Sequence, residues 1–261
     1  MTDAAKNSYV RSLVLLVSLV FLFFFLERWV FAPVMEARLP EDNVKYWEEH
    51  ARRNSGYPPS RIRLALAYTE VERLDEALHE FEAALKLQPH LDGAAIGRYG
   101  VTVAKGEKER ALTALASYAQ EHPGCGVCWQ NLAFEYLDLG RLDAAATAVD
   151  ALLASSFDVE SGMYSVGNLR FEAGLIAGRV YAARGEHQRA IAHYSDAIRE
   201  DPSDLRGYVL QAESLLASAQ PNKALAVLDE ARGRLETAEN DRMQRRIQRL
   251  QAQARRAGTS R

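Results

Sequence analysis

The feature that most constrains the fold of this chain is an alanine that recurs every 34 residues. Ala77, Ala111 and Ala145 are spaced at this interval, each within a stretch rich in leucine and alanine. From Trp129 to Tyr136, apolar residues fall at i, i+3, i+4 and i+7, which predicts one apolar face of a helix. A fixed period of this length predicts an array of similar helical units.

Each unit is expected to contain two short helices joined by a turn. In the third unit the first apolar pattern ends near Gly140, and a second pattern follows at Ala145, Val149 and Leu152. Neither helix can bury its apolar face alone, so neighbouring units must stack to form a common core. We expect five copies, at residues 58–91, 92–125, 126–159, 171–204 and 205–238, which together form the range 58–238.

The array breaks its period once. Ala190 follows Ala145 by 45 residues instead of 34, which places an insertion at residues 160–170. The insertion would either extend the first helix of the fourth copy or form a loop, and the sequence leaves both alternatives open.

The spacing W-x2-L-A-x2-Y in the third copy, followed by an alanine in the second helix, resembles the tetratricopeptide repeat family. The first copy has the same kind of pattern at Leu64, Ala65, Tyr68, Ala77, Phe81, Ala84 and Pro89. The resemblance implies an all-α fold, a TPR-like α-solenoid of helix-turn-helix repeats that binds other proteins. The chain also resembles membrane-anchored members that help to assemble membrane or exported complexes, including cytochrome c maturation.

In this family the first helices of the repeats line a concave groove. The resemblance implies that the groove of this chain contains Ile62, Leu66, Ile96, Phe134, Leu137, Leu175, Arg179, Arg206 and Val209. This set is mainly apolar and lacks the pattern of polar residues with which some members clamp a terminal carboxylate. We therefore expect an apolar helix or extended segment of a partner protein in the groove. The alternative is that the chain's own spacer or cap covers some of these side chains.

An uncharged, strongly apolar run follows the polar tail at residues 1–11. A helix over residues 10–31 would cross a bilayer of about 30 Å if Arg11 and Arg28 extend to its two surfaces. Bulky residues follow the run where a signal peptide would have small ones, which favours an uncleaved anchor. We predict a transmembrane anchor at residues 12–35, with the repeats on the periplasmic side of a bacterial inner membrane.

Two further segments flank the repeats. Residues 36–57 are expected to form a spacer with a short helix, and Ser60 is placed to cap the first repeat helix. Residues 239–261 are expected to form a basic capping helix and tail, because repeat arrays need an end helix with a polar outer face. An electrostatic contact of this helix with anionic lipid or an acidic partner is the alternative.

The two cysteines, Cys125 and Cys128, form a lone C-x-x-C where the second and third copies meet. No strand-helix-strand pattern surrounds them, and Trp129 stands where common haem attachment needs a histidine. A zinc site would need two further ligands, for which His122 and His90 are the nearest candidates. We expect a disulfide or two unpaired thiols, with a redox role as the alternative, and no metal site.

The remaining chemistry-bearing residues form no recognisable catalytic set. The net charge of -3 gives no general reason to expect a nucleic acid partner. No nucleophile, base and orienting group are grouped, and no glycine-rich phosphate loop is present. We therefore predict a membrane-anchored scaffold or assembly factor that binds other proteins, not an enzyme, with no cofactor and no small-molecule substrate. The alternative is a thiol-disulfide redox or metal-binding protein that uses the cysteine pair, for example in cytochrome c maturation.

Overall fold

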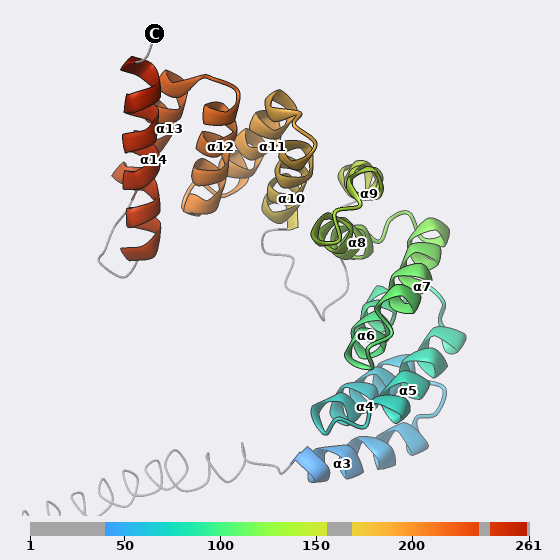
Figure 1. Cartoon of the computed structure of the whole chain (residues 1–261). Helices are drawn as coiled ribbons and strands as arrows, with labels where there is room; N and C mark the ends of the chain where they lie inside the picture. The colour runs from blue at the N-terminus through green and yellow to red at the C-terminus, as the bar shows by residue number, and fades with distance from the viewer. Residues whose placement is uncertain (1–39, 156–168, 235–240, 260–261) are drawn as a thin grey trace, which may run out of the picture. The chain divides into compact units, whose positions relative to one another are not determined.

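A computed structural model of the chain describes residues 40–155, 169–234 and 241–259 (Figure 1). These ranges contain twelve α-helices and no strand, so the expected all-α fold of helix-turn-helix repeats is confirmed. The helices are α3 (Pro40–Arg53), α4 (Pro58–Glu70), α5 (Leu74–Leu87), α6 (Asp92–Ala104), α7 (Lys108–Glu121), α8 (Gly126–Asp138), α9 (Leu142–Ala154), α10 (Leu169–Ala183), α11 (His187–Glu200), α12 (Leu205–Ala217), α13 (Pro221–Gly233) and α14 (Asp241–Thr259).

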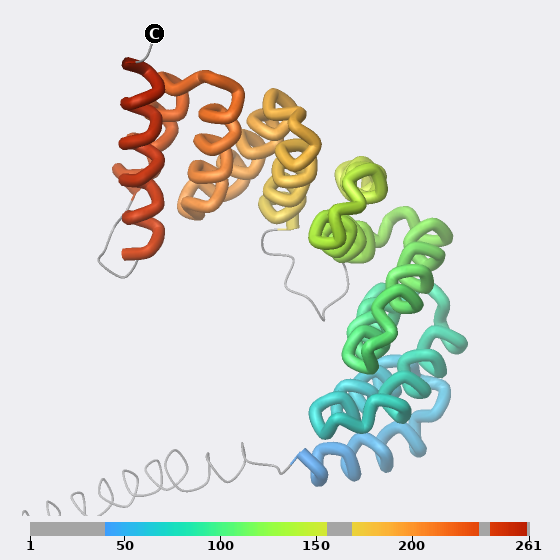
Figure 2. Tube along the Cα trace, viewed as in Figure 1, coloured from blue at the N-terminus to red at the C-terminus, as the bar shows by residue number. Residues whose placement is uncertain are grey.

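The chain divides into two compact units, one up to Ala83 and one from Ala84 onward. In the second unit the helices pack in consecutive pairs, α6 with α7, α8 with α9, α10 with α11, and α12 with α13. Figure 2 shows how the chain reverses direction within each pair. Each pair also packs against the next, since α7 contacts α8, α9 contacts α10, and α11 contacts α12.

The recurring alanine of the sequence is buried between helices in every repeat. Ala77, Ala111, Ala145, Ala190 and Ala224 are all at most 1% exposed. A methyl side chain lets two helix backbones come close together, and the larger apolar side chains around it then interlock. The period seen in the sequence is therefore the period of the helix contacts.

The turn between the two helices of each repeat contains one residue in the left-handed region. Glycine occupies this position in three repeats, with φ of 83° at Gly106, 69° at Gly140 and 77° at Gly185. In the first and last repeats the position is held by Glu72 and Ala219, with φ of 59° and 57°. The same left-handed turn therefore recurs in all five repeats, with glycine in three of them and another residue in the other two.

Helix α3 lies within the predicted spacer at residues 36–57, and it packs against α4. Val44 and Ala51 are buried, and the Tyr68 hydroxyl of α4 donates a hydrogen bond to Glu48 at 2.8 Å. The side-chain amide of Asn43 also donates to Glu70 at 3.2 Å. Helix α3 therefore covers one face of the first repeat helix.

The start of α4 differs from the predicted serine cap. The helix begins at Pro58, after Tyr57 in extended conformation, and no side chain caps it. The hydroxyl of Ser60 is buried and makes no hydrogen bond. Because a proline in the first turn has no N–H to satisfy, the helix starts without the cap, and the prediction for Ser60 was wrong.

At the other end, α14 packs against α12 and α13. Its apolar face is buried through Ile247, Leu250 and Ala254. On its polar side, Arg246 forms an ion pair with Glu213 of α12 at 2.7 Å. Helix α14 therefore covers the last helix pair with one apolar face and leaves a mostly arginine and glutamine face outside.

Several predicted segments lie outside the described residues. These are the tail at residues 1–11, the anchor at residues 12–35 and most of the insertion at residues 160–170. Helix α10 begins at Leu169, so the last two residues of the insertion are helical. Among the helices that the structure describes, none has the length and apolar character needed to cross a membrane.

Candidate functional site

A cavity of about 430 Å³ lies in the second unit, along the first helices of three consecutive repeats, α8, α10 and α12. It is lined by Gln130, Asn131, Phe134, Glu172, Leu175, Ile176, Arg179, Arg206 and Leu210. A second hollow of about 590 Å³ adjoins it, with Arg179 and Leu210 common to both. Because they share these two residues, the two hollows form one recessed surface. Its helices lie next to one another because equivalent positions of stacked repeats are neighbours.

Phe134 is the largest exposed apolar side chain of this surface, with 41% of its area accessible. The guanidinium group of Arg179 lies over its ring, with the central carbon 5.2 Å from the centroid. Arg179 has a long ion pair with Asp138, at 3.8 Å. The Asp138 carboxylate therefore neutralises the Arg179 charge only weakly, and this charge lies beside an exposed aromatic ring.

Arg206 is held much more firmly on the same surface. Its guanidinium forms ion pairs with Glu172 at 2.6 Å and with Asp204 at 2.8 Å, and it lies 5.0 Å from the centroid of the Phe171 ring. Hydrogen bonds from Arg206 to Asp204 and to Glu172 raise the pKa of Arg206 above its usual value. The two carboxylates neutralise this arginine, so it contributes less free positive charge than Arg179.

The structure brings four of the nine predicted groove residues together in the first cavity, namely Phe134, Leu175, Arg179 and Arg206. Leu137 lines the second hollow.

The other predicted groove residues lie elsewhere. Ile62 and Val209 are only 6% and 1% exposed, so they belong to the helix contacts and not to an open groove. Leu66 and Ile96 are half-buried, and neither lines the two hollows. Helix packing covers Ile62 and Val209, which the repeat pattern alone places on the groove side.

The surface is also more polar than the mainly apolar groove predicted. Gln130, Asn131 and Glu172 line the cavity in addition to the two arginines. Asn131, Ile176 and Leu210 also line the cavity and were not among the predicted groove residues. A signal for the Glu172–Arg206 ion pair was present, because these residues are 34 positions apart and so occupy the same place in successive repeats.

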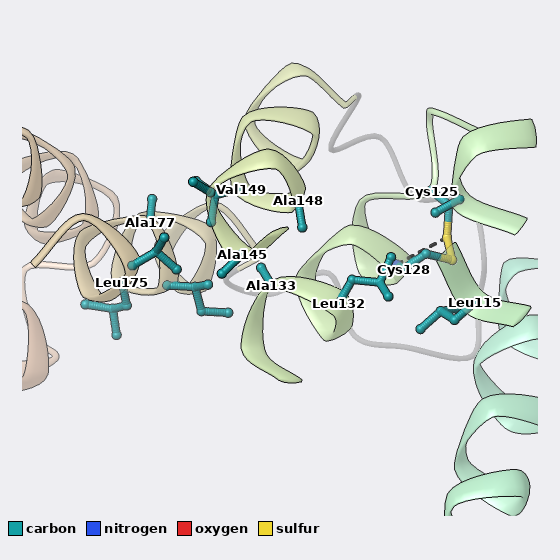
Figure 3. Packing of buried hydrophobic residues seen from close by; sticks show 14 of the residues in the cluster. Leu115, Cys125, Cys128, Leu132, Ala133, Ala145, Ala148, Val149, Leu175 and Ala177 are labelled. Carbon is teal, nitrogen blue, oxygen red and sulfur yellow. Dashed lines mark hydrogen bonds between the residues drawn. A yellow bond between two sulfur atoms is a disulfide. The ribbon is translucent and has the colours of Figure 1, made fainter. Parts of the chain in front are cut away.

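The cysteine pair lies at the start of α8, where Cys125 is the residue before the first helical turn. Cys125 and Cys128 form a disulfide, and the backbone N–H of Cys128 donates a hydrogen bond to the Cys125 sulfur at 3.3 Å (Figure 3). Both residues are buried, in the same core as Leu115 and Leu132. The sequence left open a disulfide or two unpaired thiols, and the structure contains the disulfide.

A carboxylate that the sequence analysis did not consider lies beside this disulfide. One side-chain oxygen of Asp92, at the start of α6, and the two sulfur atoms all lie within 4.8 Å of one another. The hydroxyl of Tyr118 donates a hydrogen bond to Asp92 at 2.9 Å. Asp92 precedes Cys125 by 33 positions, almost one repeat, and this spacing was the signal for their proximity.

Comparison with known proteins identifies the repeats. Residues 58–91 and residues 172–204 each match a family model described as Tetratricopeptide repeat. These two segments are tetratricopeptide repeats. No curated protein matches the chain in sequence.

Solved tetratricopeptide-repeat structures share the fold at low sequence identity. Yeast Tom70 is similar with a TM-score of 0.60 and 15% identity, over 81% of this chain and 43% of the Tom70 chain. YrrB, described as a TPR protein with an unusual peptide-binding site, has a TM-score of 0.55 and 18% identity, over 80% of this chain and 97% of YrrB.

PilW, described as a widely conserved type IV pilus biogenesis factor, has a TM-score of 0.53 and 19% identity, over 76% of this chain and 88% of PilW. At these identities the three structures show that the chain shares their fold. The chain covers less than half of Tom70, so its similarity to that protein concerns a part only.

Proposed function

We propose that this chain is a protein-binding scaffold or assembly factor, and that the surface along α8, α10 and α12 holds a segment of its partner. The observation that carries the proposal is the cavity in which exposed Phe134 stands beside Arg179. Tetratricopeptide repeats place the first helices of successive repeats side by side, and the cavity lies on those helices. A peptide-binding site is named for YrrB, which has the same fold.

The chemistry of the surface favours a particular kind of segment. An apolar side chain of the partner would pack against Phe134 and Leu175, where burial contributes roughly 25 cal/mol per Å² of apolar area removed from water. An acidic group next to it would pair with Arg179, whose bond to Asp138 is long. The partner segment therefore carries an apolar side chain and an acidic side chain close together.

The proposal includes membrane anchorage through residues 12–35, with the repeats outside the cytoplasm. The uncharged run in that segment supports the anchor. The Cys125–Cys128 disulfide supports the location, because disulfides persist in oxidising compartments such as the periplasm. A reporter enzyme that works only in the cytoplasm, fused after Arg261, should be inactive, and an active fusion would reverse the orientation.

The redox alternative has less support from the geometry. A thiol-disulfide exchange protein must present a sulfur atom to the attacking thiolate of its substrate. Both cysteines are buried in the core, with Cys128 fully covered. The position at the start of α8 is one where a disulfide holds the first turn in place.

The binding proposal is tested by affinity purification of the full chain in mild detergent, with identification of the proteins that accompany it. We expect a partner that accompanies the wild-type chain and is lost when the cavity is altered. A partner retained at full level by every cavity variant would place the binding surface elsewhere on the chain.

A further inference from the structure

We propose that in the reduced protein the thiolates of Cys125 and Cys128 and the carboxylate of Asp92 bind a thiophilic divalent cation, with Zn²⁺ as the preferred ion. The site lies in the core between α6, α7 and α8. It is separate from the cavity residues and does not depend on the proposed binding function.

The ligand set is one that Zn²⁺ takes in proteins. Zinc is bound by thiolate sulfur and carboxylate oxygen, and C-x2-C is a common spacing in zinc sites. The two sulfur atoms and one Asp92 oxygen already lie within 4.8 Å of one another. With metal-ligand bonds of about 2.0 to 2.3 Å, tetrahedral ligands stand about 3.5 Å apart, so small side-chain shifts would close the site.

Asp92 supplies the third ligand that the C-x-x-C motif lacks for a metal site. A lone C-x-x-C offers two ligands, which is too few to hold zinc firmly. The stacking of α6 beneath the start of α8 adds a third ligand from the preceding repeat. Three protein ligands leave the fourth tetrahedral position to a water molecule.

Neighbouring groups hold these ligands in place. The Tyr118 hydroxyl donates a hydrogen bond to Asp92 at 2.9 Å, which is the kind of outer contact that orients metal-bound carboxylates. The Cys128 N–H points at the Cys125 sulfur from the first turn of α8. The start of a helix carries partial positive charge, which favours the thiolate form that a metal needs.

Disulfide and metal exclude each other. The disulfide must first be reduced, for example by a phosphine: phosphine, disulfide and water give phosphine oxide and two thiols. Binding of Zn²⁺ then releases the two thiol protons. Oxidation of the pair to the disulfide would remove two of the three ligands and expel the ion.

The test uses the full chain in mild detergent, either oxidised or reduced with a phosphine that is then removed without oxygen. Each form is titrated with Zn²⁺ against a chromophoric chelator, and with Co²⁺, whose thiolate complexes absorb strongly in the near ultraviolet. We expect the reduced chain to bind one ion with proton release and with the thiolate-cobalt band. The oxidised chain should bind none at this site.

Variants locate the ligands. Cys128→Ser should abolish the cobalt band, and Asp92→Asn should weaken zinc binding by at least the roughly tenfold that loss of a mere outer contact causes. Asp143→Asn, which alters an exposed carboxylate in the first turn of α9, should leave the affinity unchanged.

Two results would overturn the proposal. One is a reduced wild-type chain without a thiolate-cobalt band, an outcome that does not depend on how any variant folds. The other is an Asp92→Asn chain, shown by its helical content to be folded, that binds zinc as tightly as the wild type.

Discussion

The guanidinium carbon of Arg179 lies 5.2 Å from the centroid of the Phe134 ring, so that a side chain of α10 reaches across the cavity to one of α8. Such a cation over an exposed aromatic ring contributes about 0.5 to 1 kcal/mol. The pair holds an aromatic surface and a positive charge side by side at the centre of the proposed binding surface. Its two members can be changed separately, because Phe134 is 41% exposed and the Arg179 side chain is 37% exposed.

Phe134→Glu should abolish partner binding without unfolding the repeats. Phe134 is 41% exposed and is not among the buried core residues, so its replacement leaves the core packing intact, while the new carboxylate would repel an acidic partner segment. The matched control is Leu139→Glu, at the end of the same helix, 39% exposed and outside both hollows. Co-purification and urea unfolding of both variants check the prediction, and normal partner recovery with Phe134→Glu would contradict it.

Arg179→Gln should weaken partner binding and reduce its sensitivity to salt. The change removes the loosely paired charge of the cavity, and salt screens the attraction that this charge exerts. Arg199→Gln is the control, since Arg199 is exposed on α11 and pairs only locally with Asp196. Partner binding is measured at two salt concentrations for both variants. An unchanged salt dependence of the Arg179→Gln variant would exclude Arg179 as a contact.

Gly178→Ala should destabilise the second unit by about 1 to 3 kcal/mol, the usual range for overpacking. A Cβ atom at Gly178 of α10 would overlap the ring of Tyr194 on α11. Gly100→Ala is the control, because a Cβ there meets nothing within 4 Å and should stabilise helix α6 by about 0.5 to 1 kcal/mol. Urea unfolding should move the two midpoints in opposite directions; a stabilised Gly178→Ala chain would show that the two helices are farther apart.

Ala219→Gly should stabilise the protein by about 0.5 to 1 kcal/mol. Ala219 has φ of 57°, a conformation that destabilises a residue with a Cβ by about 1 to 2 kcal/mol. Glycine removes this strain, but it loses more backbone entropy on folding, which offsets part of the gain. The reverse change, Gly140→Ala, places a Cβ at the equivalent turn and should destabilise. Thermal and urea unfolding measure both, and a destabilised Ala219→Gly chain would refute the argument.

The stability of the fold should fall as the pH rises above about 10. Burial raises the pKa of six described tyrosines, Tyr68, Tyr99, Tyr118, Tyr181, Tyr194 and Tyr208. For Tyr181, burial and then the Asp150 carboxylate raise the pKa to about 12. An unfolded tyrosine loses its proton near pH 10, so between about pH 10 and 12 the unfolded state binds fewer protons and is favoured.

Urea unfolding below and above pH 10 measures this effect. The free energy of unfolding should be nearly independent of these tyrosines below pH 10 and should decline above it. Tyr181→Phe removes one of the six and should make the decline shallower. A flat profile through this range would mean that the tyrosines are exposed to solvent.

Local regularities let the sequence predict the helices. The alanine period and the i, i+3, i+4 spacing can both be read directly from the order of residues along the chain, so they predict helices without knowledge of the fold. The groove positions of Phe134 and Arg179 came from the resemblance to tetratricopeptide repeats, and both residues line the same cavity.

Burial could not be predicted in the same way. Ile62 and Val209 have groove positions in the repeat pattern, yet the packing of adjacent helices covers them. The mistaken cap at Ser60 has a similar origin, since two prolines already began the helix upstream of the serine. Whether a side chain is exposed depends on how closely neighbouring helices approach, which the spacing of one helix does not contain.

The sequence by itself determined the class of fold, the period of the repeats and the presence of a cysteine pair, because each is written in residues close together along the chain. Only the tertiary structure decided which groove residues meet in a cavity, and only it placed Asp92 beside Cys125 and Cys128. These relationships join residues one or two repeats apart. Their distance is set by the side-chain volumes that hold one helix pair against the next.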